Sequence, residues 1–144
     1  MAKRVLIAED EPSILASLEF LMRRAGYETR NAADGEEALQ LLAVFRPHLV
    51  LLDIMLPRRS GLDVCREIRA DASLSGTRVL MLTAKGGNRD HERGLEAGAD
   101  DYVTKPFSTQ DLVARAQALL ADPVLRLAPG AIPRQHPWAP PRPA

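Results

Sequence analysis

The sequence has a single cysteine, Cys65, so no disulfide bond can form within the chain. Long apolar runs are missing too: only four apolar residues separate Met-Ala-Lys-Arg at the N-terminus from Glu9, too few for a signal peptide or a membrane span. Net charge is also absent, because acidic and basic side chains number 19 each, and no nucleic-acid footprint is visible. These absences predict a cytoplasmic protein that contacts neither membrane nor nucleic acid directly.

The last part of the chain has a different composition from the rest. Residues 123–144 contain seven prolines, three arginines and no acidic residue, and they have no helical periodicity. Such a composition is typical of an extended tail or linker. We therefore predict one domain over residues 1–122, which is long enough to bury a single core, and a proline-rich C-terminal tail or linker over residues 123–144.

Within residues 1–122, short apolar runs alternate with amphipathic segments five times. The predicted strands are 5–8, 27–32, 49–52, 79–82 and 102–104. The predicted helices begin at Pro12, after Asp34, at Gly61, at Asn88 and after Ser108. Three of the strands are continuously apolar, as parallel strands buried on both faces should be, whereas the mixed composition of 27–32 suits an edge. The pattern predicts an α/β fold: a doubly wound, five-stranded parallel sheet of the flavodoxin-like type, with helices on both faces.

Polar side chains stand at the ends of four of these predicted strands. They are Glu9-Asp10, Asp53, Thr83 and Lys105-Pro106. In a parallel sheet all carboxyl ends open on the same edge, and ligands bind in the crevice outside that edge. Each residue taken singly has an ordinary structural role, as a helix cap, a strand end or a solvated charge. Their recurrence at four strand ends instead predicts one convergent site.

The chemistry of these side chains suits a divalent cation and a phosphoryl group. The carboxylates of Asp10 and Asp53 are the hard oxygen ligands that Mg²⁺ or Mn²⁺ requires, and Glu9 could hold a coordinated water. With the cation bound, the free oxygen of Asp53 is an unprotonated nucleophile able to form an aspartyl phosphate. The Lys105 ammonium and the Thr83 hydroxyl would then neutralise phosphoryl oxygens.

Four segments of the chain resemble the receiver domain of two-component response regulators. They are VLIAEDEP (5–12), LVLLDIMLPRRSGLD (49–63), VLMLTAK (79–85) and GLEAGADDYVTKPF (94–107). The resemblance extends from residue 3 to about residue 121. It implies that Asp53 is the phosphoacceptor and that the remaining roles belong to Glu9 and Asp10 as the acidic pair, the Met55 backbone carbonyl as a metal ligand, Thr83 as the hydroxyl and Lys105 as the ammonium.

The same resemblance implies how such a domain is loaded and what it switches. The phosphodonor would be the phosphohistidine of a partner histidine kinase or phosphotransfer protein, and the only reactions expected are self-phosphotransfer and autodephosphorylation, not those of an enzyme. The Lys105-Pro106 peptide bond would be cis. On phosphorylation Thr83 would move toward the phosphoryl group and Tyr102 would turn inward, which would change the surface of the fourth helix, fifth strand and fifth helix and so signal to a partner.

Segment 94–107 most resembles receivers of winged-helix DNA-binding regulators, which dimerise through this face. Asp101 and Arg115 remain as a candidate intermolecular pair, but His91, Glu92 and Gln117 stand where arginine, an apolar residue and lysine are usual. Exposed ion pairs contribute only about 0 to 1 kcal/mol each, so the Asp101–Arg115 pair would not make up for the apolar contact that is lost at Glu92. We expect a monomer or a weak, phosphorylation-dependent dimer.

Three interpretations remain open at this point. The first is a stand-alone phosphoacceptor, because no output domain fits into 22 proline-rich residues. The second is the N-terminal receiver of a longer DNA-binding regulator, with the tail as the start of its linker. The third, a small phosphatase or flavodoxin-like redox protein, is disfavoured because the sequence has neither a glycine-rich phosphate loop nor a second nucleophile or base.

Overall fold

The computed structural model describes residues 2–84 and 88–121, which form one parallel sheet with helices on both faces. The strand order is β2-β1-β3-β4-β5, and every neighbouring pair is parallel. The elements in chain order are β1 (Arg4–Ala8), α1 (Pro12–Arg24), β2 (Glu28–Ala32), α2 (Gly35–Phe45), β3 (Leu49–Asp53), α3 (Gly61–Ala70), the 3₁₀ helix η1 (Ala72–Leu74), β4 (Arg78–Thr83), α4 (Asn88–Ala97), β5 (Asp101–Thr104) and α5 (Thr109–Ala121). The predicted doubly wound fold is confirmed.

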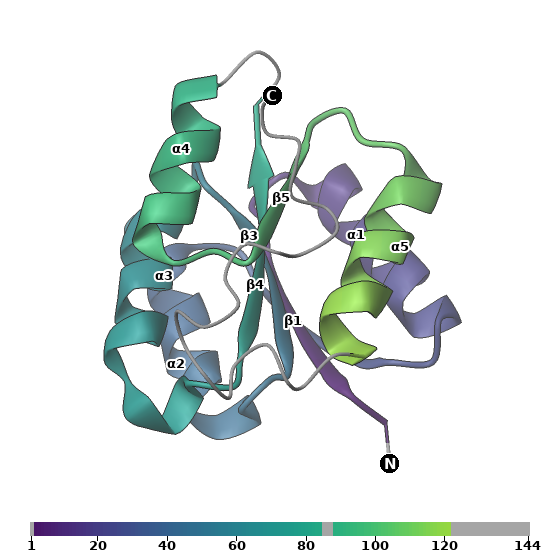
Figure 1. The fold of residues 1–144 in the computed structure, drawn as a ribbon. Helices are drawn as coiled ribbons and strands as arrows, with labels where there is room; N and C mark the ends of the chain where they lie inside the picture. The colour runs from purple at the N-terminus through teal and green to yellow at the C-terminus, as the bar shows by residue number, and fades with distance from the viewer. Residues whose placement is uncertain (1, 85–87, 122–144) are drawn as a thin grey trace.

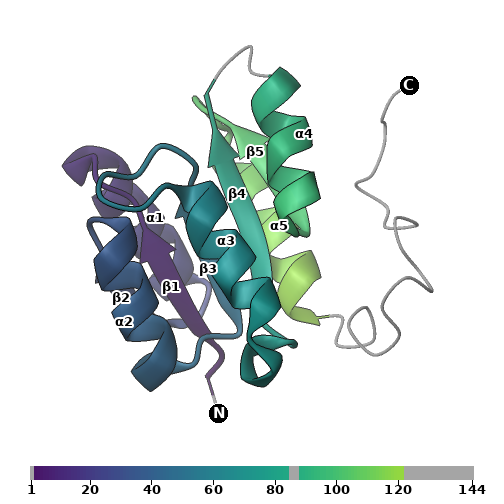
Figure 2. The same ribbon diagram turned by 90° about the vertical axis from the view of Figure 1, so that its left-hand side faces the viewer.

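The helices divide into two layers. Figure 1 shows α1 and α5 on one side of the sheet and α2, α3 and α4 on the other, and Figure 2 shows the second group lying across its face. Side chains alternate along each strand, so that Val5 and Ile7 pack toward α1 and α5 while Leu6 and Ala8 pack toward α2 and α3. Two apolar cores therefore fix the sheet from both faces.

Burial follows the position of each strand in the sheet. Every residue of β3 and β4 is buried, as their continuous apolar sequences predict, whereas β2 alternates between exposed and buried residues at the edge. The prediction that β2 is an edge strand is confirmed. The carboxyl ends of the buried strands β1, β3 and β4, together with that of β5, carry the predicted site.

Local signals at the helix starts agree only partly with the sequence prediction. Asp34 caps α2 as predicted, since its side chain accepts a hydrogen bond of 2.8 Å from the Glu37 backbone N–H. The cap of α1 is Glu11, whose carboxylate accepts hydrogen bonds from the N–H groups of Ser13 and Ile14. Glutamate is not among the favoured capping residues, so sequence reasoning did not identify Glu11.

Across residues 2–84 and 88–121, every helix is too short or too polar to span a lipid bilayer. The predicted proline-rich tail lies outside the described residues.

Candidate active site

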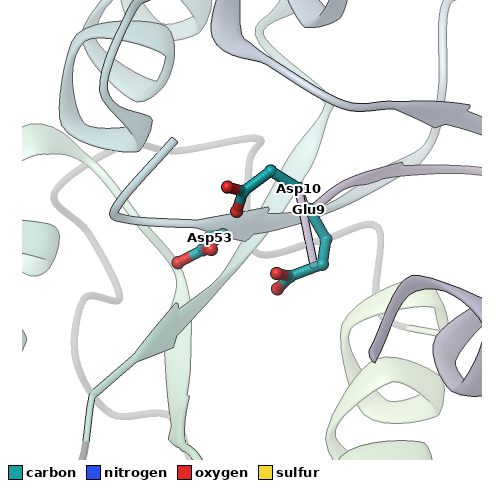
Figure 3. A group of neighbouring side chains, drawn as sticks. All are labelled: Glu9, Asp10 and Asp53. Carbon is teal, nitrogen blue, oxygen red and sulfur yellow. The ribbon is translucent and has the colours of Figure 1, made fainter. Parts of the chain in front are cut away.

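The four predicted strand ends meet at one edge of the sheet. Glu9 and Asp10 follow β1, Asp53 ends β3, Thr83 ends β4 and Lys105 follows β5. Figure 3 shows the three carboxylates of Glu9, Asp10 and Asp53 gathered there, and one oxygen from each lies within 4.8 Å of the others. Because the carboxyl ends of parallel strands share one edge, the sheet brings together residues that are up to 96 positions apart in the chain.

Both carboxylate oxygens of Asp53 are held by neighbouring groups. Oδ1 accepts a hydrogen bond of 3.0 Å from the Met55 backbone N–H, and Oδ2 lies 3.2 Å from the Lys105 Nζ. The residue itself is only 4% exposed. The carboxylate is thus buried and fixed in orientation by contacts to both of its oxygens.

Lys105 joins Asp53 to the second buried carboxylate, Glu9. Its Nζ lies 2.8 Å from the Glu9 Oε1, while the Glu9 Oε2 accepts a hydrogen bond of 3.0 Å from the Glu11 backbone N–H. Burial raises the pKa of Glu9 more than these two contacts lower it. Desolvation would lower the pKa of Lys105, but the two carboxylates outweigh it and raise that pKa, so the ammonium stays charged.

The donor set fits a hard divalent cation. Asp10 is exposed beside the buried Asp53, so an ion could reach both carboxylates from solvent. Carboxylates this close repel one another, and a bound cation would relieve that repulsion. Met55 lies in the loop directly after β3, and the residue is 71% exposed. The role of its backbone carbonyl as a metal ligand stays a prediction.

The two predicted switch residues have different contacts: Thr83 bonds to the backbone of β5, and Tyr102 stacks on a side chain of α4. The Thr83 hydroxyl is fully buried and donates a hydrogen bond of 3.3 Å to the Val103 carbonyl of β5. Tyr102 is half-buried, and its ring stacks on the imidazole of His91. The Lys105-Pro106 peptide bond is cis. Sequence reasoning treated His91 only as a departure from relatives, because a contact between α4 and β5 leaves no local signal.

Two glycines allow the surrounding loops to approach the site closely. A Cβ placed on Gly61 would lie 2.2 Å from the Asp53 carbonyl oxygen, and one on Gly35 would lie 2.1 Å from the Arg59 carbonyl oxygen. Gly61 begins α3, as the sequence predicts. Gly35 was missed, because next to the cap Asp34 it looks like an ordinary helix start.

The structure joins Asp101 and Arg115 within one chain. The Arg115 Nη1 lies 2.8 and 3.0 Å from the two carboxylate oxygens of Asp101, and Arg115 also contacts Asp111. Asp101 is 1% exposed, and this burial raises its pKa to about 6 even though Arg115 opposes the shift. A role of the pair between two chains stays a prediction.

Comparison with known proteins agrees with this arrangement. A family model for the response regulator receiver domain matches residues 5–117 of the chain. The chain belongs to this receiver domain family. It is a CheY-like domain of two-component systems, with the five-stranded parallel sheet and five helices described above.

Solved structures similar to this chain cover most of it and nearly all of their own length. A protein from Chloroflexus aurantiacus assigned as a response regulator is 40% identical over 84% of this chain and 99% of its own, with a TM-score of 0.81. The receiver domain of a sensor histidine kinase from Pseudomonas aeruginosa, crystallised with a magnesium ion in its active-site cleft, is 31% identical over 84% and 99%, with a TM-score of 0.77. The chemotaxis response regulator CheY4 of Vibrio cholerae is 28% identical over 83% and 99%, with a TM-score of 0.78.

Proposed function

We propose that this receiver domain accepts a phosphoryl group on Asp53 from the phosphohistidine of a partner kinase or phosphotransfer protein. An oxygen of Asp53 would form the bond to phosphorus while the bond from phosphorus to the donor nitrogen breaks. The observation that carries the proposal is the placement of Asp53 at a strand end, within 3.2 Å of the Lys105 ammonium and beside two further carboxylates. Carboxylate nucleophiles flanked by cations are suited to phosphoryl transfer.

The acidic residues would hold the divalent cation. Asp10, Asp53 and the Met55 carbonyl would bind it directly, and Glu9 would act through a water. A bound Mg²⁺ or Mn²⁺ would supply positive charge to the carboxylates and to the phosphoryl oxygens. The magnesium ion in the similar Pseudomonas aeruginosa receiver supports this assignment.

Lys105 and Thr83 would respond to the added phosphoryl group. The ammonium already lies against Asp53, so phosphoryl oxygens bound there would come within its reach. The Thr83 hydroxyl would leave the Val103 carbonyl to donate to the same oxygens. Tyr102 would then turn inward, and the surface formed by α4, β5 and α5 would signal to a protein partner.

The domain would work as a phosphoacceptor rather than a turnover enzyme. Both a stand-alone regulator and the N-terminal receiver of a longer DNA-binding regulator are compatible with this activity, and the length of the native open reading frame would discriminate them. The cytoplasmic location predicted from the sequence stays part of the proposal.

Acetyl phosphate with Mg²⁺ tests the proposal directly. Intact-mass measurement should detect one added phosphoryl group, which should disappear in Asp53→Asn and when the metal is chelated. Asp63→Asn, which changes an exposed aspartate on α3, is the matched control and should be labelled like the wild type. Full labelling of Asp53→Asn, or sustained turnover of an unrelated phosphoester, would overturn the assignment.

A further inference from the structure

We propose that His91 is a positioning residue for Tyr102 and sets the balance between the two ring orientations that the switch needs. The inference rests on the proposed function, because it concerns how phosphorylation of Asp53 would be transmitted. It is carried by two contacts that His91 of α4 makes to β5.

The first contact covers a face of the tyrosine ring. The ring centroids of His91 and Tyr102 are 3.9 Å apart, and the ring planes differ by only 18°. Such a close stack contributes favourably beyond the burial of the two rings. A turn of the Tyr102 ring away from the imidazole would lose this contact, so the stack favours the orientation seen here.

The second contact fixes the imidazole itself. The His91 Nε2 lies 3.2 Å from the Thr104 Oγ1, at hydrogen-bond distance, two residues beyond Tyr102 on the same strand. The imidazole is therefore held by both contacts rather than free to follow the tyrosine. The imidazole of His91 is thus held in place while the Tyr102 ring packs against it.

The same short strand also contacts the site. Thr104 pairs with Thr83 in the β4–β5 register, and the Thr83 hydroxyl donates to the carbonyl of Val103. Residues 102–104 consequently connect His91 on one side with Thr83 on the other. A movement of Thr83 toward a phosphoryl group would break this hydrogen bond to the strand that carries Tyr102 and Thr104.

The carboxyl end of α4 is anchored separately. Arg69 of α3 donates hydrogen bonds of 2.8 Å to the Gly98 carbonyl and 2.7 Å to the Asp100 carboxylate. Loss of the His91 contacts would thus loosen the attachment of α4 to β5 at His91, while the carboxyl end of the helix stays attached to α3. The output would be a local change of the α4–β5 surface rather than detachment of the helix.

Fluorine NMR of the full chain labelled with 3-fluorotyrosine tests the inference. The chain has only two tyrosines, and Tyr27, which packs on the α1 side of the sheet, serves as the internal reference. In the wild type, beryllofluoride with Mg²⁺ should move the Tyr102 resonance. In metal-free His91→Ala, that resonance should already move toward the beryllofluoride position, corresponding to a roughly three- to tenfold change in the ratio of orientations.

Matched variants separate positioning from general loosening. His91→Phe keeps a stacking ring and should leave the Tyr102 resonance near its wild-type position. Thr104→Val removes only the hydroxyl that orients the imidazole and should cause a smaller shift in the direction of His91→Ala, which keeps the test available if His91→Ala fails to fold. An unmoved resonance in the folded variants, or a shift in His91→Phe as large as in His91→Ala, overturns the inference.

Failure of the proposed function would look different. In that case wild-type Asp53 would not be labelled by acetyl phosphate, whereas the effect of His91→Ala is read in the unliganded chain. A chain that is labelled normally but shows no response of Tyr102 to His91→Ala would remove the positioning role alone.

Discussion

At the scale of single residues, the site combines buried and exposed carboxylates with the Lys105 ammonium. Lys105 contacts both Glu9 and Asp53, which offsets the cost of burying these two groups. Asp10 lies against the same cluster, exposed to solvent. The metal-free cluster should therefore be under electrostatic strain that a divalent cation would relieve.

Replacing Asp10 by asparagine should stabilise the metal-free protein. The change removes one negative charge from the cluster, and we expect the free energy of unfolding to rise by about 1 kcal/mol. Mg²⁺ should stabilise the wild type more than Asp10→Asn, because the variant has lost a ligand. Urea unfolding with and without Mg²⁺ measures both effects, with Asp63→Asn as the exposed control. A variant less stable than the wild type without metal would contradict the argument.

The buried Asp101 should make stability depend on pH. Its pKa is raised from 3.8 to about 6 in the folded chain, so the folded state holds this proton more tightly than the unfolded state. Ionisation then costs stability as the pH rises through the interval from about 4 to 6. Asp101→Asn cannot ionise, so its stability should increase relative to the wild type across that interval, by on the order of 3 kcal/mol.

Urea unfolding of the wild type and of Asp101→Asn at several pH values between 4 and 7 measures this difference in stability. All other titrating groups are shared by the two chains, so their contributions largely cancel. A difference that stays constant with pH would show that Asp101 has an ordinary pKa in the folded protein.

At the scale of elements, α3 begins against the backbone of Asp53. Gly61→Ala would place a Cβ 2.2 Å from the Asp53 carbonyl oxygen, a backbone atom that can move only with β3. We expect a loss of at least about 2 kcal/mol in the free energy of unfolding. Gly76→Ala is the matched control: nothing lies within 4 Å of its added Cβ, so stability should stay the same or rise by up to about 1 kcal/mol. Thermal unfolding compares the two, and equal melting temperatures would refute the packing argument.

The elements themselves were largely predictable from the sequence. The apolar runs at 5–8, 49–52 and 79–82 could be interpreted as buried parallel strands because no other element of that length has so few polar residues. The 3₁₀ helix at 72–74 was missed, since a single short turn has no periodicity to detect.

The sequence predicted which residues form the site, but not the contacts between their side chains. The positions of Glu9, Asp53 and Lys105 at the carboxyl ends of predicted parallel strands identified them, because the sheet topology alone decides that they share one edge. It did not predict that Lys105 would contact both carboxylates or that the Thr83 hydroxyl would bond to β5. Such side-chain orientations depend on neighbours from other elements, and these are fixed only when the sheet is assembled.

At the scale of the whole molecule, association through the α4–β5–α5 face would compete with contacts made inside each chain. The Asp101–Arg115 pair is already satisfied within the chain, with both carboxylate oxygens bound and Asp101 buried. Exchanging it for an intermolecular pair would gain no ion pair. Glu92 at an exposed position of α4 further lowers the apolar content of this face.

We therefore expect a monomer, or at most a weak dimer, both with and without a phosphoryl group on Asp53. Sedimentation velocity of the full chain should give a monomer at micromolar concentration, and beryllofluoride with Mg²⁺ should change the sedimentation coefficient little. Arg115→Ala removes the only arginine that contacts Asp101 among the described residues. The variant should therefore stay monomeric but have a less stable fold. A tight dimer that forms with beryllofluoride and is abolished by Arg115→Ala would mean that the pair exchanges between chains after all, since an intramolecular pair has no reason to control association.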